Sequence, residues 1–128
     1  MLKNEPGFTR GTINVRVWLQ GDTVEYRPMQ ALLAGGLAVH HKLSDDYHGT
    51  DVHEMLSKWT VSHVLSGLRI HRRNALLSRT QALAICRRCL PLTDWLQDEV
   101  TVRTLNFNTD LMARVDIIVN QILEEVLA

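Results

Sequence analysis

Residues 58–73, KWTVSHVLSGLRIHRR, constrain the fold more than any other stretch, because apolar and polar side chains alternate on both sides of a Ser-Gly pair. If that pair forms a two-residue turn, the stretch is a β-hairpin in which Leu65 lies opposite Leu68. One face then carries the apolar side chains together with His63, and the other carries polar and basic ones. A slip of one residue would mix the two faces, so the pattern favours this register. A three-residue loop with Gly67 in a left-handed conformation is the alternative.

Alternation also predicts strands before the hairpin. Residues 12–19 have the period of a half-buried strand, and residues 24–27 can pair back with them across a Gly-Asp turn. We expect Pro28 to end this second strand and residues 29–34 to form a helical turn. A third strand is expected over residues 37–42.

The second half of the chain predicts two helices. Ser78 and Gln81 form a capping box, the apolar residues that follow repeat at helical spacing, and Pro91 ends the helix. A longer helix begins at Thr109. Between the helices, residues 99–105 alternate weakly and could add an edge strand. We expect a core that joins the two helices to the hairpin, made of Leu111, Val115, Ile118, Ile122, Leu83, Trp59 and Val61.

These elements predict an α+β fold: a small single domain, residues 1–128, with an antiparallel sheet of about four to five strands covered on one face by two main helices. The composition, 45% apolar and 22% charged, is ordinary for a soluble globular protein. No apolar run approaches the roughly 20 residues of a membrane helix, and residues 1–11 lack a signal-peptide core. We therefore expect a cytoplasmic protein with no membrane contact.

Charge is distributed unevenly, although 14 basic and 14 acidic residues give no formal net charge. Residues 55–93 carry seven basic side chains and no acidic one. Residues 94–128 carry seven acidic side chains and two arginines. Such asymmetry indicates either a charged partner or a balance between the two stretches.

The candidate partner site is the basic end of the hairpin with the start of the next helix: Arg69, His71, Arg72, Arg73 and Arg79. We expect Arg69, His71 and Arg73 to point to solvent, where arginines beside a helix N-terminus can bind phosphates. The hairpin-then-helix order is similar in architecture to small DNA-binding modules such as the arm-binding domains of integrases, with no shared motif. The alternative is a basic face balanced by the acidic C-terminal helix, within one chain or across a homodimer.

Two groups of residues have the chemistry of metal ligands. All six histidines lie between residues 40 and 71, with four carboxylates among them at Asp45, Asp46, Asp51 and Glu54. Their spacing matches no ligand template, so we expect solvated loop histidines, one core histidine at His63, and no metal. Cys86 and Cys89 form a CxxC near a helix C-terminus, where the dipole opposes a thiolate. No second CxxC completes a zinc site, so we expect buried, reduced cysteines.

No nucleophile elbow, P-loop or dinucleotide-binding glycine motif is present. We therefore expect a small non-enzymatic binding protein without a cofactor, acting through contacts with a protein partner that the sequence does not identify. The alternative is a nucleic-acid-binding module that uses the basic hairpin 58–73 and the start of the following helix. A metal-dependent enzyme built on the His/Asp loop is a third hypothesis.

Overall fold

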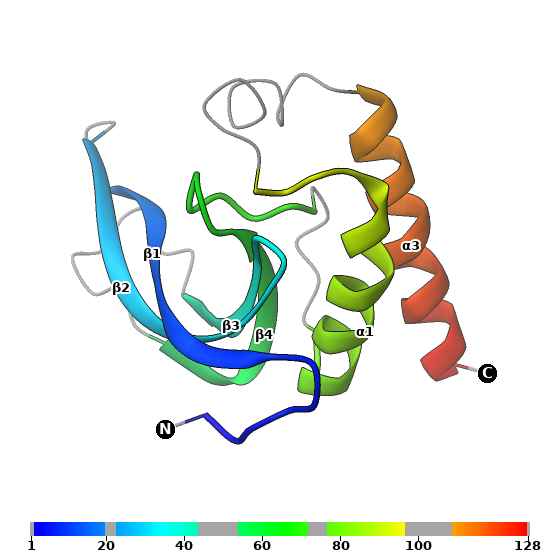
Figure 1. Ribbon diagram of the computed structural model, residues 1–128, viewed down its shortest axis with the longest axis horizontal. Coiled ribbons are helices and arrows are strands. Elements are labelled where there is room, and N and C mark those ends of the chain that lie inside the picture. The colour runs from blue at the N-terminus through cyan, green and yellow to red at the C-terminus, as the bar shows by residue number, and fades with distance from the viewer. Residues whose placement is uncertain (1, 20–22, 44–53, 72–76, 97–108, 128) are drawn as a thin grey trace.

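A curled antiparallel sheet lies beside two helices in a computed structural model of the chain (Figure 1). The structure describes residues 2–19, 23–43, 54–71, 77–96 and 109–127. The strands follow one another in the sheet in the order β1 (Thr9–Leu19), β2 (Thr23–Ala34), β3 (Leu37–Leu43) and β4 (Glu54–His63). The helices are α1 (Arg79–Cys89), a short 3₁₀ turn η1 (Leu90–Leu92) and α3 (Thr109–Leu127). The predicted α+β class, with a four-stranded sheet and two main helices, is confirmed.

The second strand is longer than predicted. Pro28 does not end β2, and residues 29–34 continue the strand instead of forming a helical turn. Pro28 lies opposite Asn14 of β1, and within the described strands β2 pairs with β3 only at Leu32–Ala34. Proline is tolerated at such a position because its nitrogen, which has no hydrogen to donate, faces the side where no strand pairs with β2. Where β2 leaves β3, a hollow of about 300 Å³ is lined by Arg27, Pro28, Met29, Leu43 and Glu54.

The predicted hairpin has a different register. The Val61 carbonyl accepts from the Ile70 amide, and the His63 amide donates to the Leu68 carbonyl. The pairing is thus shifted by two residues from the predicted one, which keeps the same residues on the same face but lengthens the turn. Gly67 has a left-handed φ of 71°, as the alternative turn required. Residues 68–71 pair with β4 only through an isolated bridge and form no strand.

Gly67 also brings the two ends of the sheet together. Its carbonyl accepts a hydrogen bond of 3.0 Å from the Arg16 amide of β1, and a Cβ at this position would collide with the Asn14 carbonyl. The turn after β4 therefore docks on the edge of β1, so the sheet curls toward a closed barrel. The curl gives the sheet a concave inner face and a convex outer face (Figure 1).

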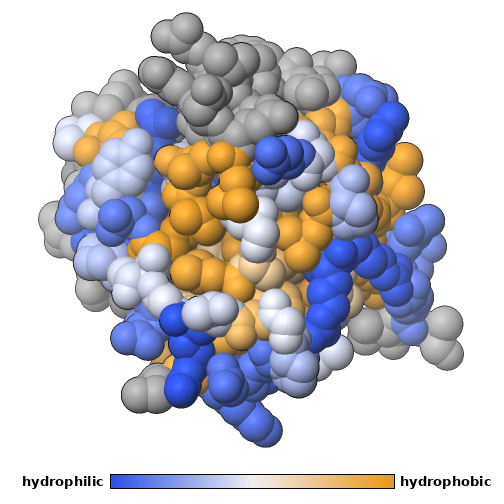
Figure 2. All heavy atoms as spheres, in the orientation of Figure 1, coloured by the Kyte–Doolittle hydropathy of each residue, from blue (hydrophilic) through white to orange (hydrophobic). Residues whose placement is uncertain are grey.

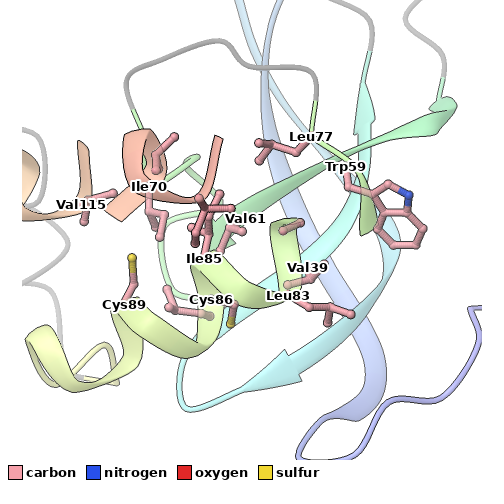
Figure 3. Close-up of a cluster of buried hydrophobic side chains, with 14 of the residues drawn as sticks. Val39, Trp59, Val61, Ile70, Leu77, Leu83, Ile85, Cys86, Cys89 and Val115 are labelled. Atoms are coloured by element: carbon pink, nitrogen blue, oxygen red, sulfur yellow. The ribbon is translucent and has the colours of Figure 1, made fainter. Parts of the chain in front are cut away.

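The curl creates two apolar cores. The inner face carries a small cluster made of Ile13, Val15, Val17, Met29, Ala31 and Ala38. The larger cluster lies between the outer face of β3 and β4 and the helices (Figure 3). Because one face of β3 and β4 packs on helices and the other fills the curl, Trp59 through His63 are all buried. This explains why polar residues of β4 lie in the interior.

The helices complete the larger core. The predicted capping box is present at Ser78. The Ser78 hydroxyl accepts from the Gln81 amide, and the side-chain oxygen of Gln81 accepts from the Ser78 amide. Helix α1 packs on β3 and β4, and α3 packs on α1. The expected core residues are buried together, except that Ile118 is only partly buried at its edge. The strand predicted over residues 99–105 lies outside the described residues.

The apolar stripe of α3 generates a stability prediction. Ile122 is buried in the core, whereas Ile117 of the same helix is exposed. The change Ile122→Ala should lower the free energy of unfolding by about 2–5 kcal/mol, because it removes buried methylenes and leaves a cavity. The matched change Ile117→Ala should alter it by less than about 0.5 kcal/mol. Urea melts of the two variants test this, and equal losses would mean that α3 is packed differently.

Candidate binding surfaces

Arg79, predicted to contact a partner, instead fastens residues 2–8 to the domain. Its Nη2 donates to the Lys3 carbonyl at 2.7 Å, and its Nη1 lies 3.7 Å from a Glu5 carboxylate oxygen. The guanidinium also lies over the Trp59 ring, 5.9 Å from the centroid. These contacts occupy Nη1 and Nη2 of Arg79, the groups with which it would bind a phosphate.

The other two arginines of α1 are also neutralised within the chain. Arg87 donates to Glu5 at 2.8 Å and to the Pro6 carbonyl at 3.1 Å. That hydrogen bond to Glu5 lowers the pKa of its carboxyl. Arg88 makes a bidentate pair with Glu125 of α3 at 3.0 and 3.1 Å. This last pair supports the alternative in which acidic residues of the C-terminal helix balance the basic block.

The hairpin end of the predicted site is only partly described. Arg72 and Arg73 lie outside the described residues. Arg69 is half-buried, and its Nε donates to the His71 carbonyl at 2.9 Å. The prediction that His71 points to solvent is wrong: it is 3% exposed, and its Nε2 lies 3.1 Å from the Thr60 hydroxyl. In an isolated hairpin the face that carries His71 would point to solvent. Here that face lies in the interior, because the sheet curls over it.

A second buried histidine lies deeper in the same interior. His40 of β3 donates from Nδ1 to the His41 carbonyl at 2.8 Å, so its Nε2 accepts from the Ser62 hydroxyl, also at 2.8 Å. Burial lowers the pKa of His40 to about 4, and the nearby rings of His41 and His71 add to this. Since Ser62 and His40 are both fully buried, this serine–histidine pair does not face a substrate. It holds β3 to β4 with a neutral imidazole.

His63, the histidine predicted for the core, links the end of β4 to two other segments. Its Nε2 donates to the Trp95 carbonyl at 2.8 Å, and its Nδ1 accepts from the Ser66 hydroxyl at 2.9 Å. Burial lowers the pKa of His63, consistent with a neutral ring in this arrangement. Trp95 in turn donates from its indole to the Cys89 carbonyl at the end of α1. The turn after β4 and the segment after α1 are thereby held side by side.

These contacts create an apolar surface that sequence patterns did not predict. The Val64 amide donates to the Gly36 carbonyl, and Gly36 packs on the Trp95 backbone. The exposed side chains beside this contact are Leu65, at 49%, and Leu96, at 62%. We call the surface around these two leucines, where the turn before β3, the turn after β4 and the segment after α1 meet, the junction surface. Figure 2 shows a continuous apolar area at the centre of the face where these segments meet. Leu65 was expected to point inward, and the longer turn places it outside.

Both cysteines are buried, as predicted, and neither forms a disulfide. Burial raises the pKa of Cys86 and of Cys89 to about 12, so both are protonated thiols at neutral pH. Across the described ranges, no group of three or more histidine, cysteine or acidic residues is arranged to hold a metal ion. His48 and His53 lie outside those ranges.

The buried histidines predict acid sensitivity. Because the pKa of His40 is about 4 in the folded protein and near 6.5 when exposed, the unfolded chain binds more protons between these values. The free energy of unfolding should therefore decrease as the pH falls from 6.5 toward 4. The decrease from His40 alone is about 3 kcal/mol. Denaturant melts from pH 7 to pH 4 measure this. The variant His40→Gln should flatten the curve, and equal slopes in both proteins would contradict the prediction.

The cysteines give a second test. In the native protein, Cys86 and Cys89 should react with a thiol reagent such as Ellman's reagent far more slowly than in denaturant, because burial removes both access and thiolate. The absorbance of the released product, followed with and without urea, measures the rate. Rapid native labelling would place the thiols at the surface.

In the part of the chain that the structure describes, no helix is long and apolar enough to cross a membrane. The candidate binding surfaces are the junction surface, with its exposed leucines, and the faces of the sheet that the helices leave uncovered. Comparisons with protein-family models, with curated proteins and with solved structures found no match. Function has to be inferred from the geometry of the chain itself.

Proposed function

We propose that the protein is a non-enzymatic module that binds another protein through the junction surface. The observation that carries this proposal is the exposure of two leucines, Leu65 at 49% and Leu96 at 62%, on two segments that the buried hydrogen bonds of His63 join. Single exposed leucines are common on protein surfaces and indicate no function. Exposed apolar side chains that lie together form a patch, and such a patch marks an interaction site.

The rigidity of this surface favours binding. Both leucines are next to residues that His63 holds in place: Leu65 precedes Ser66, and Leu96 follows Trp95. A patch that is already ordered loses little conformational entropy when a partner covers it. The partner best suited to it presents aliphatic or aromatic side chains at the centre of the contact and polar groups around it.

The charge distribution also favours a protein partner over the predicted phosphate-binding site. Arg79, Arg87 and Arg88 already pair with acidic groups or carbonyls of the same chain. A phosphate would have to displace these contacts to bind the same guanidinium groups. Binding of nucleic acid by the hairpin through Arg69, Arg72 and Arg73 stays a prediction.

The test compares three proteins in a nuclease-treated pull-down: wild type, the double change Leu65→Ser with Leu96→Ser, and Leu56→Ser. Leu56 is an exposed leucine on β4, outside the junction surface, and serves as the matched control. We expect a partner retained by wild type and by Leu56→Ser, and at least a tenfold weaker retention by the double variant. Light scattering at rising concentration shows whether that partner is a second copy. Identical capture by all three proteins would contradict the proposal.

A further inference from the structure

The edge of β2 that faces β3 is paired over only part of its length. Residues of a strand direct their backbone groups alternately to its two edges, and the Arg16 amide of β1 points away from β2 to the Gly67 carbonyl. Through the register, the odd-numbered residues of β1 and β2 therefore bond to each other. The even-numbered residues of β2 direct their N–H and C=O groups toward β3, and of these only Leu32 and Ala34 have a partner in the described ladder.

Two features of these strands disfavour further pairing. Continuation of the register would place Gln30 opposite His41 and Pro28 opposite Leu43. The His41 carbonyl already accepts from Nδ1 of His40 at 2.8 Å, so the first of these pairs would share an acceptor. Pro28 has no N–H, so the second pair would lack a donor.

The separation leaves an open strand edge along residues 26–30 of β2. Tyr26, Pro28 and Gln30 are exposed there, and no residue of the described ranges pairs with their backbone groups on this side. The hollow of about 300 Å³ lies beside this edge, because it is lined by residues 27–29 of β2 and by Leu43 and Glu54 at the ends of β3 and β4. Figure 1 shows β2 continuing past the point where it parts from β3. An open edge next to a hollow has the hydrogen-bonding groups and the room for a further strand.

The open edge is held in place without a ligand. β2 bonds to β1 along its other side, over the full length of both strands. Its inward side chains, Met29 and Ala31, are packed in the small core. Because this strand is already ordered, only the incoming segment loses much conformational entropy on binding.

We propose that this edge of β2 binds an extended peptide segment of a partner protein by β-strand addition. The carbonyls of Tyr26, Pro28 and Gln30 would accept from amides of the added strand, and the amides of Tyr26 and Gln30 would donate to its carbonyls. The hollow, with Met29 and Leu43 in its wall, would receive one apolar side chain of that strand. Main-chain bonds give such a site affinity, and the hollow gives it selectivity. The site is separate from the junction surface and does not depend on the function proposed for it.

The first experiment measures amide hydrogen exchange of the full chain by NMR. In the free protein, the amides of Tyr26 and Gln30 should exchange about tenfold faster or more than those of Arg27 and Met29, because the latter two donate to β1. Equal protection of all four amides would show that the edge is already covered, and would overturn the proposal. Protection that appears only at high protein concentration would place a second copy of the chain on the edge, and would overturn it too.

The second experiment supplies a strand. The probe is a synthetic peptide selected on the wild-type chain from a phage-displayed library of short random peptides. Candidates that fail to bind the double leucine variant are discarded, because they bind the junction surface. Peptide binding should slow exchange of the Tyr26 and Gln30 amides. Methylation of every second peptide nitrogen should abolish binding in one phase and spare it in the other, since only alternate amides of an added strand face β2. A selection that yields no peptide protecting these two amides would overturn the proposal.

A pair of proline variants locates the site on the protein. Gln30→Pro removes an edge donor and leaves the bonds to β1 intact, so it should weaken peptide binding about threefold to tenfold. The matched control is Thr12→Pro, because Thr12 lies directly opposite Gln30 and directs its N–H to the far edge of β1. It should bind the peptide as wild type does. Thermal melts check that both variants fold, and the methylated peptides carry the test if Gln30→Pro does not. Equal weakening by the two variants would overturn the proposal.

The two binding sites can be tested apart. The double leucine variant of the junction surface should bind the selected peptide normally. Gln30→Pro should retain the partner captured through the junction surface. Failure of one proposal therefore leaves the other intact.

Discussion

The buried ring of His63 holds together the parts of the structure that are far apart in the sequence. It joins the end of β4 to Ser66 in the next turn and to Trp95 beyond α1, and Trp95 then caps a carbonyl at the end of that helix. The same turn reaches β1 through Gly67. Closure of the sheet, the seating of α1 and the formation of the junction surface thus depend on one neutral imidazole with both nitrogens satisfied.

Buried histidines that pair with hydroxyl groups recur in this interior. His40 pairs with Ser62 and His71 with Thr60, so polar groups on β3 and β4 meet one another inside the curl. A buried polar group without a partner would cost about as much as several buried methylenes contribute, so these pairs must form together with the curl. A flat sheet would leave the same residues in water and lose the small core. Curvature and the polar pairs therefore stabilise one another.

The basic block has a structural explanation in the described residues. Three arginines of α1 hold residues 2–8 on one side and α3 on the other. Exposed ion pairs contribute little individually, but Arg79 also packs on Trp59 and binds a carbonyl, which fixes the path of the chain into β1. With the charges of these three arginines balanced internally, the junction surface offers a partner mainly apolar side chains.

Local periodicity determined much of the fold from the sequence alone. Alternation located β1, β3 and the inward face of the hairpin, and the Ser78 capping box and the apolar stripe of α3 located the helices, because these signals act over a few residues. The burial of Cys86 and Cys89 followed from the apolar stripe of α1. Tertiary structure decided the strand ends and the side-chain burial that depend on contacts between segments distant in the sequence. Pro28 stayed within β2 because β3 does not pair there, and His71 became buried because the sheet curls. Leu65 became exposed because the turn after His63 is longer than predicted. The junction surface belongs to this second class, because Leu65 and Leu96 lie on segments that only tertiary hydrogen bonds bring together.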